Sequence, residues 1–184
     1  MKLKVTRKVE FKTEDLCIGD QITVKLKGYG KHTATVQRIT DKGVLFLFDD
    51  IIARCTMNSL NTNEGGYGKS YMAYWLCDVL LPAFPAKLRE KVTCITLPTY
   101  GEIFGHDDFY ENLEADEDEQ LPLMQERRNR VCDLNGDCCS WWLRNAMKAD
   151  KSSNSFLAVN ISGFSSYDGA TYLNGVRPEF WLAR

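Results

Sequence analysis

The sequence predicts an α+β fold with a mainly antiparallel sheet and two or more helices. The first observation is a series of β-type segments between residues 21 and 48 that short turns connect. The second is that the later helical and β-type segments are interspersed without the strand–helix–strand rhythm of a parallel sheet. The third is the length of 184 residues, which suits a single domain over residues 1–184.

Composition and charge are those of an ordinary soluble globular protein. Hydrophobic residues make up 44% of the chain and charged residues 26%. The net charge of −2 gives no electrostatic reason to expect a nucleic-acid partner or an acidic membrane surface. No apolar run approaches the ~18 residues that a membrane span requires. Residues 1–8 are basic but lack the apolar core of a secretory signal, so we expect none.

The N-terminal part has the pattern of an antiparallel meander. Residues 1–20 are expected to form an extension or an edge strand that ends in a turn. Residues 21–27 alternate apolar and polar side chains, as a half-buried strand does, and a second strand follows at 33–39. The turn between this strand and the next ends in Gly43, which suits a positive φ. Residues 44–48 are continuously apolar, which predicts a central strand covered on both faces.

A polar, glycine-rich loop at residues 61–68 precedes the first predicted helix. Ser70 is placed to cap this helix, and Pro82 is expected to end it. An apolar stripe at helical spacing predicts that one face packs on the core. The stripe consists of Met72, Trp75, Leu76, Val79 and Leu80.

Shorter elements follow this helix. We expect a short basic helix at residues 86–91 and a strand at 92–97. Thr99 and Glu102 have capping-box spacing, so another short helix should begin there.

The middle of the chain contains an acidic segment, a basic segment and a turn. Residues 106–120 are rich in Asp and Glu without the spacing of a calcium loop, so we expect a solvated loop. Residues 121–131 have a helical pattern, with arginines at the C-terminal end that the helix dipole favours. Residues 133–137 also have too few ligands for calcium, and a hydrogen-bonded turn is expected.

Two blocks of aromatic residues and arginine bracket a polar run near the end of the sequence. They are Trp-Trp-Leu-Arg at residues 141–144 and Gly-Val-Arg-Pro-Glu-Phe-Trp-Leu at 175–182. An aromatic ligand cage is one interpretation, but we expect at least one of the two adjacent tryptophans in the core. We also expect Arg144 and Arg177 to be tied to carbonyls or carboxylates of the protein itself.

The bracketed run, residues 154–174, has the composition of a binding loop. Tyrosine provides a large and rigid contact area, while Ser, Gly and Asn adapt their hydrogen bonds. An ordinary β-hairpin and its loop have the same composition. Composition alone therefore leaves the two interpretations open.

Several blocks together resemble a domain family of unknown function that is common in gut Firmicutes and their phages. These blocks are Ser70 with Trp75-Leu76, the region of Phe84, residues 95–98 with Glu102, Trp142-Leu143-Arg144, residues 175–178, and Phe180-Trp181-Leu182. The meander at residues 35–48 matches the opening strands of that family. The family is similar to the formylglycine-generating-enzyme branch of the C-type lectin fold. The resemblance thus implies a single C-type lectin-like domain.

The same fold carries the variable proteins of diversity-generating retroelements, in which a C-terminal segment displays changing side chains on a fixed scaffold. The resemblance implies that residues 141–182 are such a ligand-display segment in a non-enzymatic protein, phage-encoded or retroelement-diversified. A protein or glycan ligand would bind to the surface at residues 154–174. The implied ligand-binding residues are Phe156, Asn160, Ser162, Phe164, Ser166, Tyr167, Asp168 and Tyr172.

Two alternatives remain: a divergent cysteine- or metal-dependent enzyme of the formylglycine-generating type, and a phage structural protein. Cys132, Cys138 and Cys139 are the candidates for the enzyme, but they lack Cys-x-x-Cys spacing and do not match the copper-binding pair. The two histidines lie far apart in sequence, so no catalytic triad can be assembled. We expect no catalytic residue, metal or cofactor. The odd total of seven cysteines favours free thiols, and hence a cytoplasmic or virion-associated protein.

Overall fold

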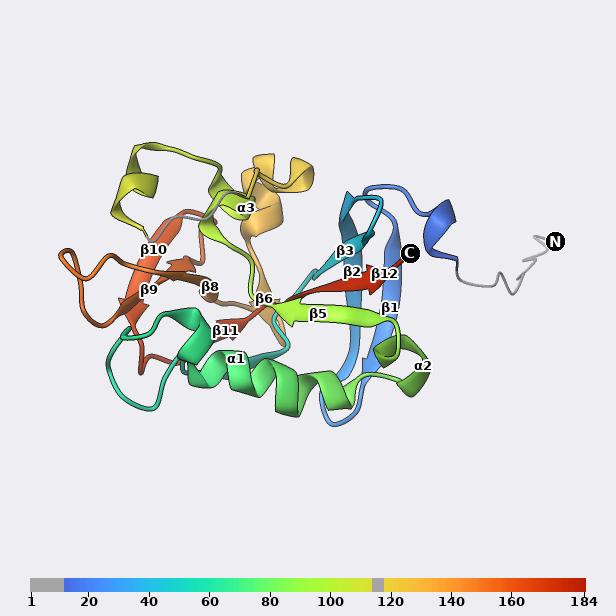
Figure 1. Ribbon diagram of the computed structural model, residues 1–184, viewed down its shortest axis with the longest axis horizontal. Coiled ribbons are helices and arrows are strands. Elements are labelled where there is room, and N and C mark those ends of the chain that lie inside the picture. The colour runs from blue at the N-terminus through green and yellow to red at the C-terminus, as the bar shows by residue number, and fades with distance from the viewer. Residues whose placement is uncertain (1–11, 114–117) are drawn as a thin grey trace.

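The computed structural model describes residues 12–113 and 118–184, and its strands form two five-stranded sheets. Sheet A has the order β1-β2-β3-β12-β5, and sheet B has the order β10-β9-β8-β11-β4. Among the named strands of these two sheets, every pair is antiparallel except β8 with β11. Figure 1 shows the sheets in the middle of the molecule, with α1 and α2 on one side and α3 on the other. The predicted α+β class with mainly antiparallel sheets and a few helices is confirmed.

Sheet A contains the predicted meander. Its strands are β1 (Gln21–Leu26), β2 (Gly30–Ile39), β3 (Gly43–Phe48), β12 (Glu179–Ala183) and β5 (Val92–Thr96). Every residue of β3 is buried, as the apolar run predicted. A positive φ was predicted for Gly43, and this was wrong, since Gly43 is not among the glycines with positive φ. A Cβ atom at Gly43 would lie 2.6 Å from the carbonyl oxygen of Leu182, so close approach to β12 requires the glycine.

Sheet B contains most of the C-terminal part. Its strands are β10 (Ser165–Gly169), β9 (Ser155–Val159), β8 (Trp141–Ala146), β11 (Asn174–Val176) and β4 (Ala53–Cys55). A separate hairpin, β6 (Asp133–Leu134) and β7 (Asp137–Cys138), turns at Asn135 and Gly136, which both have positive φ. The turn predicted at residues 133–137 is therefore confirmed.

The first helix is less regular than its apolar stripe predicted. Ser70 caps α1 (Tyr71–Trp75), because its Oγ accepts a hydrogen bond from the amide of Ala73 at 3.0 Å. The chain continues as a π-helical turn (Leu76–Leu80) and then as a 3-10 turn (Leu81–Ala83) that passes through Pro82. Val79 is 38% exposed, contrary to prediction, because the wider π turn rotates it away from the core.

The remaining helical elements are short. They are α2 (Ala86–Arg89), α3 (Tyr100–Phe104) and the 3-10 turns Thr13–Asp15, Tyr67–Lys69, Asp108–Asn112, Pro122–Gln125 and Arg127–Arg130. Both hydrogen bonds of the predicted capping box, between Thr99 and Glu102, are present at the start of α3. The single helix predicted at residues 121–131 is wrong, because Glu126 has an extended conformation and separates two 3-10 turns.

The prediction for residues 1–20 falls partly outside the described residues. Within residues 12–20 the chain forms the 3-10 turn and then a turn closed by the amide of Asp20 and the carbonyl of Cys17. This part contains no strand. None of the helices in the described ranges is long and apolar enough to cross a membrane.

Two hydrophobic cores cover opposite faces of the sheets. The first core packs α1 and its continuation against Phe46, Phe180 and Trp142. The second core packs α3 and the 3-10 turns after it against Leu45, Leu47 and other residues of β3, β8 and β9. The sheets are therefore covered on both faces, and adjacent residues of one strand can both be buried.

Candidate functional site

The two adjacent tryptophans of β8 both belong to the scaffold. Trp142 lies in the first core and Trp141 in the second, and each is 0% exposed. Both indole groups also donate a hydrogen bond, Trp142 to the carbonyl of Cys55 at 2.9 Å and Trp141 to that of Arg130 at 2.8 Å. The expectation that at least one would be buried is confirmed for both, and neither can form a ligand cage.

Arg177 joins three segments of the chain from within the protein. Its Nε donates to the carbonyl of Phe48 at 2.7 Å, and its Nη1 donates to that of Asn129 at 3.0 Å. The guanidinium also stacks over the ring of Trp141 at 5.0 Å. The side chain is buried, so Arg177 is a structural cation, as its sequence context predicted.

Arg144 is the centre of a mixed cluster of charges. It donates to the carboxylate of Asp118 at 2.9 Å, and Arg38 pairs with both Glu102 at 3.4 Å and Asp118 at 3.9 Å. Asp118 belongs to the segment predicted to be a solvated loop, and it is a loop residue, but its side chain is only 31% exposed because it pairs with Arg144 and Arg38. Residues 114–117 of the same segment lie outside the described part.

A buried carboxyl group lies in this cluster. Glu179 is 2% exposed, and its Oε2 has no hydrogen-bond partner. Burial raises the pKa of the Glu179 carboxyl well above its ordinary value, and Glu102 raises it further, while Arg144 acts in the opposite direction. The folded protein therefore holds a proton on Glu179 at pH values at which the unfolded chain has released it.

We expect Glu179 to make the protein less stable as the pH rises. Because its pKa is higher in the folded state, its stabilising contribution is full below the ordinary value of 4.5 and is lost as the pH rises through the folded pKa. Glu179→Gln should be about as stable as the wild type at pH 4 and more stable at pH 8. Urea unfolding across this range measures the difference. Glu64→Gln, at an exposed position, is the control. If the free energy of unfolding of Glu179→Gln changed with pH as that of the wild type does, the raised pKa of Glu179 would be refuted.

The structure separates the eight predicted ligand-binding residues into three groups. Phe164, Tyr167 and Tyr172 are exposed, by 54%, 55% and 63% respectively. Ser162 is also exposed, and Ser166 is partly exposed. These five residues fit the predicted surface.

Two further predicted residues mainly shape the loop. Oδ1 of Asn160 accepts the amides of Ser162 at 2.9 Å and Phe164 at 3.1 Å, which fixes the turn between β9 and β10. Oδ2 of Asp168 accepts a hydrogen bond from Asn174 at 2.8 Å. Both side chains are partly exposed, so they support the surface from within the loop.

Phe156 does not belong to this surface. It is 0% exposed and packs in the first core, because β9 lies between β8 and β10 and both faces of this strand are covered. The sequence contained the signal, since residues 156–159 are continuously apolar like the central strand β3.

Sequence reasoning missed several exposed apolar side chains next to the predicted ones. Ile161 is 55% exposed and Leu173 is 64% exposed. Five of the ten large apolar side chains exposed among the described residues lie between positions 161 and 173. These five define the 161–173 surface: Ile161, Phe164, Tyr167, Tyr172 and Leu173.

Contacts from distant parts of the chain hold this surface in place. Arg127 donates to the carbonyl of Ser162 at 3.0 Å and stacks on the ring of Phe164 at 4.8 Å. Gly163 has a φ of 78°, and a Cβ atom there would lie 2.8 Å from the carbonyl oxygen of Arg127. Asn63 is buried and donates to the carbonyls of Met147, Ser152 and Ser155, which fixes the loop before β9.

The three cysteines considered for the enzyme alternative differ in burial. All seven cysteines are free, and Cys132 and Cys139 are buried while Cys138 is exposed. Burial raises the pKa of the Cys132 thiol to about 11, so it is a poor nucleophile at neutral pH. No group of three or more His, Cys, Asp or Glu residues in the described ranges is placed to hold a metal ion.

The comparisons with known proteins give one match. No curated protein and no solved structure matches the chain. The match covers the residues from the capping Glu102 through the tryptophan block, the 161–173 surface and β12. Residues 102–184 match the model of DUF6273, a domain of unknown function.

Proposed function

We propose that this protein is a non-enzymatic binding protein that presents the 161–173 surface on a C-type lectin-like scaffold, as variable proteins of diversity-generating retroelements do. The observation that carries the proposal is the concentration of exposed apolar side chains in this one run. Apolar side chains gathered on a surface mark sites of interaction, whereas scattered ones need no explanation.

The placement of the surface supports this function. Its middle is β10, which is one of the two edge strands of sheet B, and the turns on either side carry the remaining apolar residues. The scaffold beneath has its tryptophans and Arg177 fully engaged within the protein. Substitutions of the exposed side chains would thus leave the cores unchanged, which suits a surface that displays variable residues.

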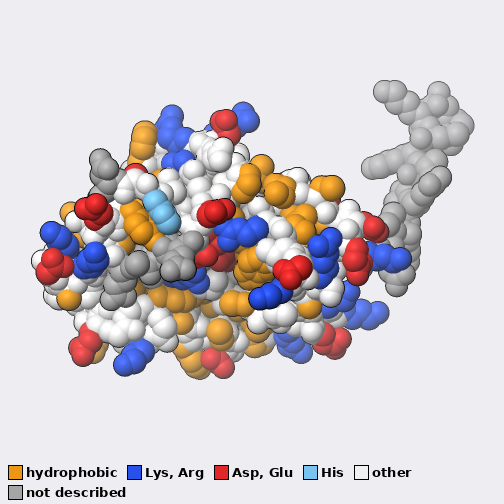
Figure 2. Space-filling view, turned by 45° about the horizontal axis from the view of Figure 1, so that its top comes forward, with side chains coloured by type: hydrophobic (Ala, Val, Ile, Leu, Met, Phe, Trp, Pro, Cys, Tyr) orange, Lys and Arg blue, Asp and Glu red, His pale blue; other side chains and the backbone are white. Residues whose placement is uncertain are grey.

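The chemistry of the surface favours a protein ligand over a glycan. Tyr167, Tyr172 and Phe164 provide rigid aromatic anchors, which suit both classes of ligand. Ile161 and Leu173 add exposed aliphatic area, which cannot form hydrogen bonds with the hydroxyl groups of a sugar. Figure 2 shows acidic and basic side chains interspersed on one face of the molecule, in keeping with the net charge of −2 and with a partner other than nucleic acid.

Replacing both Tyr167 and Tyr172 by alanine is expected to abolish ligand binding and leave the fold intact. Both rings are more than half exposed, so their removal leaves no cavity. The tagged wild-type protein and the double variant are applied to the same arrays of random peptides and of glycans. We expect wild-type signals on a set of peptides, and at least tenfold weaker binding of the same purified peptides by the double variant.

Tyr74→Ala is the matched control, because Tyr74 is 56% exposed and belongs to α1 rather than to residues 161–173. It should bind as the wild type does. Equal binding by the double variant would show that the 161–173 surface is not the binding site. Unfolding of the double variant, measured by circular dichroism, would instead show that the tyrosines stabilise the fold and would refute the display proposal.

A further inference from the structure

A polar cavity lies between sheet A and the 3-10 turns of residues 122–130. Its volume is about 320 Å³. The floor comes from the face of β2 that lies opposite the first core, since Thr35 and Gln37 alternate with the core residues Ala34 and Val36. The lining residues are Gln21, Thr35, Gln37, Asp49, Leu123, Met124, Arg128, Asn129, Val131 and Arg177.

The floor of this cavity has an unused hydrogen-bond acceptor. Gln37 is 2% exposed, and its Nε2 makes a long bond of 3.4 Å to the carbonyl of Thr35. Its Oε1 has no partner. A buried acceptor without a donor is costly and rare, so a ligand that brings a donor to this atom would supply a hydrogen bond that the described residues do not.

The same cavity is lined by a carboxylate that two hydrogen bonds hold in position. Oδ1 of Asp49 accepts the hydroxyl of Thr35 at 2.5 Å, and Oδ2 accepts the amide of Gln21 at 3.0 Å. A carboxylate has about four acceptor positions, so two remain for another donor. Asp49 and Gln37 together suit a group with several N–H donors.

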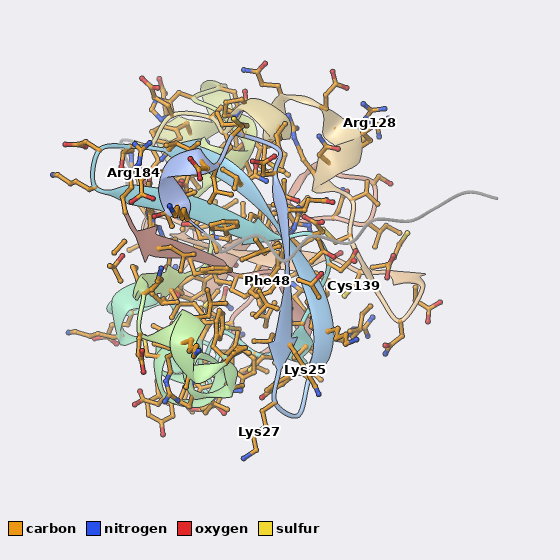
Figure 3. The ribbon with its side chains drawn as sticks, turned by 90° about the vertical axis from the view of Figure 1, so that its right-hand side faces the viewer. Lys25, Lys27, Phe48, Arg128, Cys139 and Arg184 are labelled. Atoms are coloured by element: carbon orange, nitrogen blue, oxygen red, sulfur yellow. The ribbon has the colours of Figure 1, made fainter. Side chains whose placement is uncertain are left out.

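An unpaired cation lies at the rim of the same cavity. Arg128 is exposed, and within residues 12–113 and 118–184 its side chain makes no hydrogen bond or ion pair. Figure 3 shows Arg128 at the periphery of the molecule, whereas Phe48 lies in the interior. A guanidinium with free donors binds a carboxylate through two parallel hydrogen bonds.

We propose that this cavity binds a free α-amino acid, with the ammonium group at Gln37 and Asp49 and the carboxylate at Arg128. An ammonium group supplies three donors to the acceptors of the floor, and a carboxylate neutralises the cation at the rim. The volume is at the lower end of the range for small-molecule sites, which suits a ligand of this size. None of the five side chains of the 161–173 surface lines the cavity, and the proposal does not depend on the function of that surface.

The test measures thermal unfolding of the full chain with each common α-amino acid at about millimolar concentration, because a ligand of the folded state raises the unfolding temperature in a saturable way. We expect at least one amino acid to raise it. The matching amine without a carboxylate, the matching acid without an amine, and glucose should each have no effect. Titration calorimetry then gives the dissociation constant for the active amino acid.

Two variants locate the site. Gln37→Met removes the acceptor, and Arg128→Ala removes the exposed guanidinium, so each should weaken binding at least tenfold. Arg54→Ala, which removes an exposed arginine from β4, is the control and should bind as the wild type does. Arg128→Ala keeps the test valid if Gln37→Met does not fold.

Three outcomes would overturn the proposal. If no amino acid raises the unfolding temperature, the donor to Gln37 is an ordered water. If glucose or the single-charge analogues act as strongly as the amino acid, the cavity does not recognise a zwitterion. If Arg128→Ala binds with wild-type affinity, the carboxylate is held elsewhere.

Discussion

Trp142→Ala is expected to lower the free energy of unfolding by about 3–5 kcal/mol, the range for removing a large buried aromatic side chain. Trp142 is 0% exposed in the first core, where it packs with residues from both sheets and from α1. The substitution also leaves the carbonyl of Cys55 without its donor. Urea unfolding followed by circular dichroism at constant pH measures the change.

Trp142→Phe separates packing from hydrogen bonding. It keeps an aromatic ring but removes the indole N–H, so most of the stability should remain, with a loss of about 1–3 kcal/mol for the unsatisfied carbonyl and the smaller ring. Tyr74→Ala, at an exposed ring, should cost under about 0.5 kcal/mol. A Trp142→Ala protein as stable as the Tyr74→Ala protein would show that this indole does not hold the core.

Arg177→Met is expected to have a comparable effect, about 3–5 kcal/mol, because two hydrogen bonds to a charged group are lost and each contributes about 1.5–3 kcal/mol. The carbonyls of Phe48 and Asn129 would lose their donors, and the ring of Trp141 would lose the guanidinium above it. These contacts join the end of β3, the turn before β6 and the link between β11 and β12. The loss should therefore appear as a lower unfolding temperature of the whole protein.

Arg177→Lys tests whether geometry or charge is responsible. A lysine keeps the positive charge but has no planar fork to reach both carbonyls, so we expect it to recover little of the lost stability. Arg54→Met removes an exposed arginine and should be close to neutral. Full recovery by lysine would mean that the charge alone is needed at this position.

Local patterns in the sequence correctly predicted the elements that depend on neighbouring residues alone. Residues 44–48 became the buried strand β3, and Thr99 with Glu102 formed both bonds of a capping box. The pattern failed where the helix departs from α-helical geometry. Val79 has the right spacing for a buried helical residue, but the π turn at residues 76–80 exposes it.

The position of the exposed 161–173 surface was predicted, but its composition was predicted only in part. Tyr167 and Tyr172 were identified from loop composition, and they are exposed. Ile161 and Leu173 were missed, because aliphatic residues are more often buried and only the structure shows them at the surface. The support from Arg127 could not be read from sequence, since 35 positions separate it from the carbonyl of Ser162 that it binds.

The position of β12 in sheet A has a consequence for synthesis. This strand lies between β3 and β5, and its Phe180 ring stacks on Phe46 at 5.4 Å, although more than 130 positions separate the two residues. On the ribosome, β3 emerges long before its partner and has one unpaired, highly apolar edge in the meantime. Such long-range pairing makes folding slow, and an exposed strand edge favours aggregation. A nascent chain stalled before residue 179 would therefore be a natural client for chaperones, whatever the released protein binds.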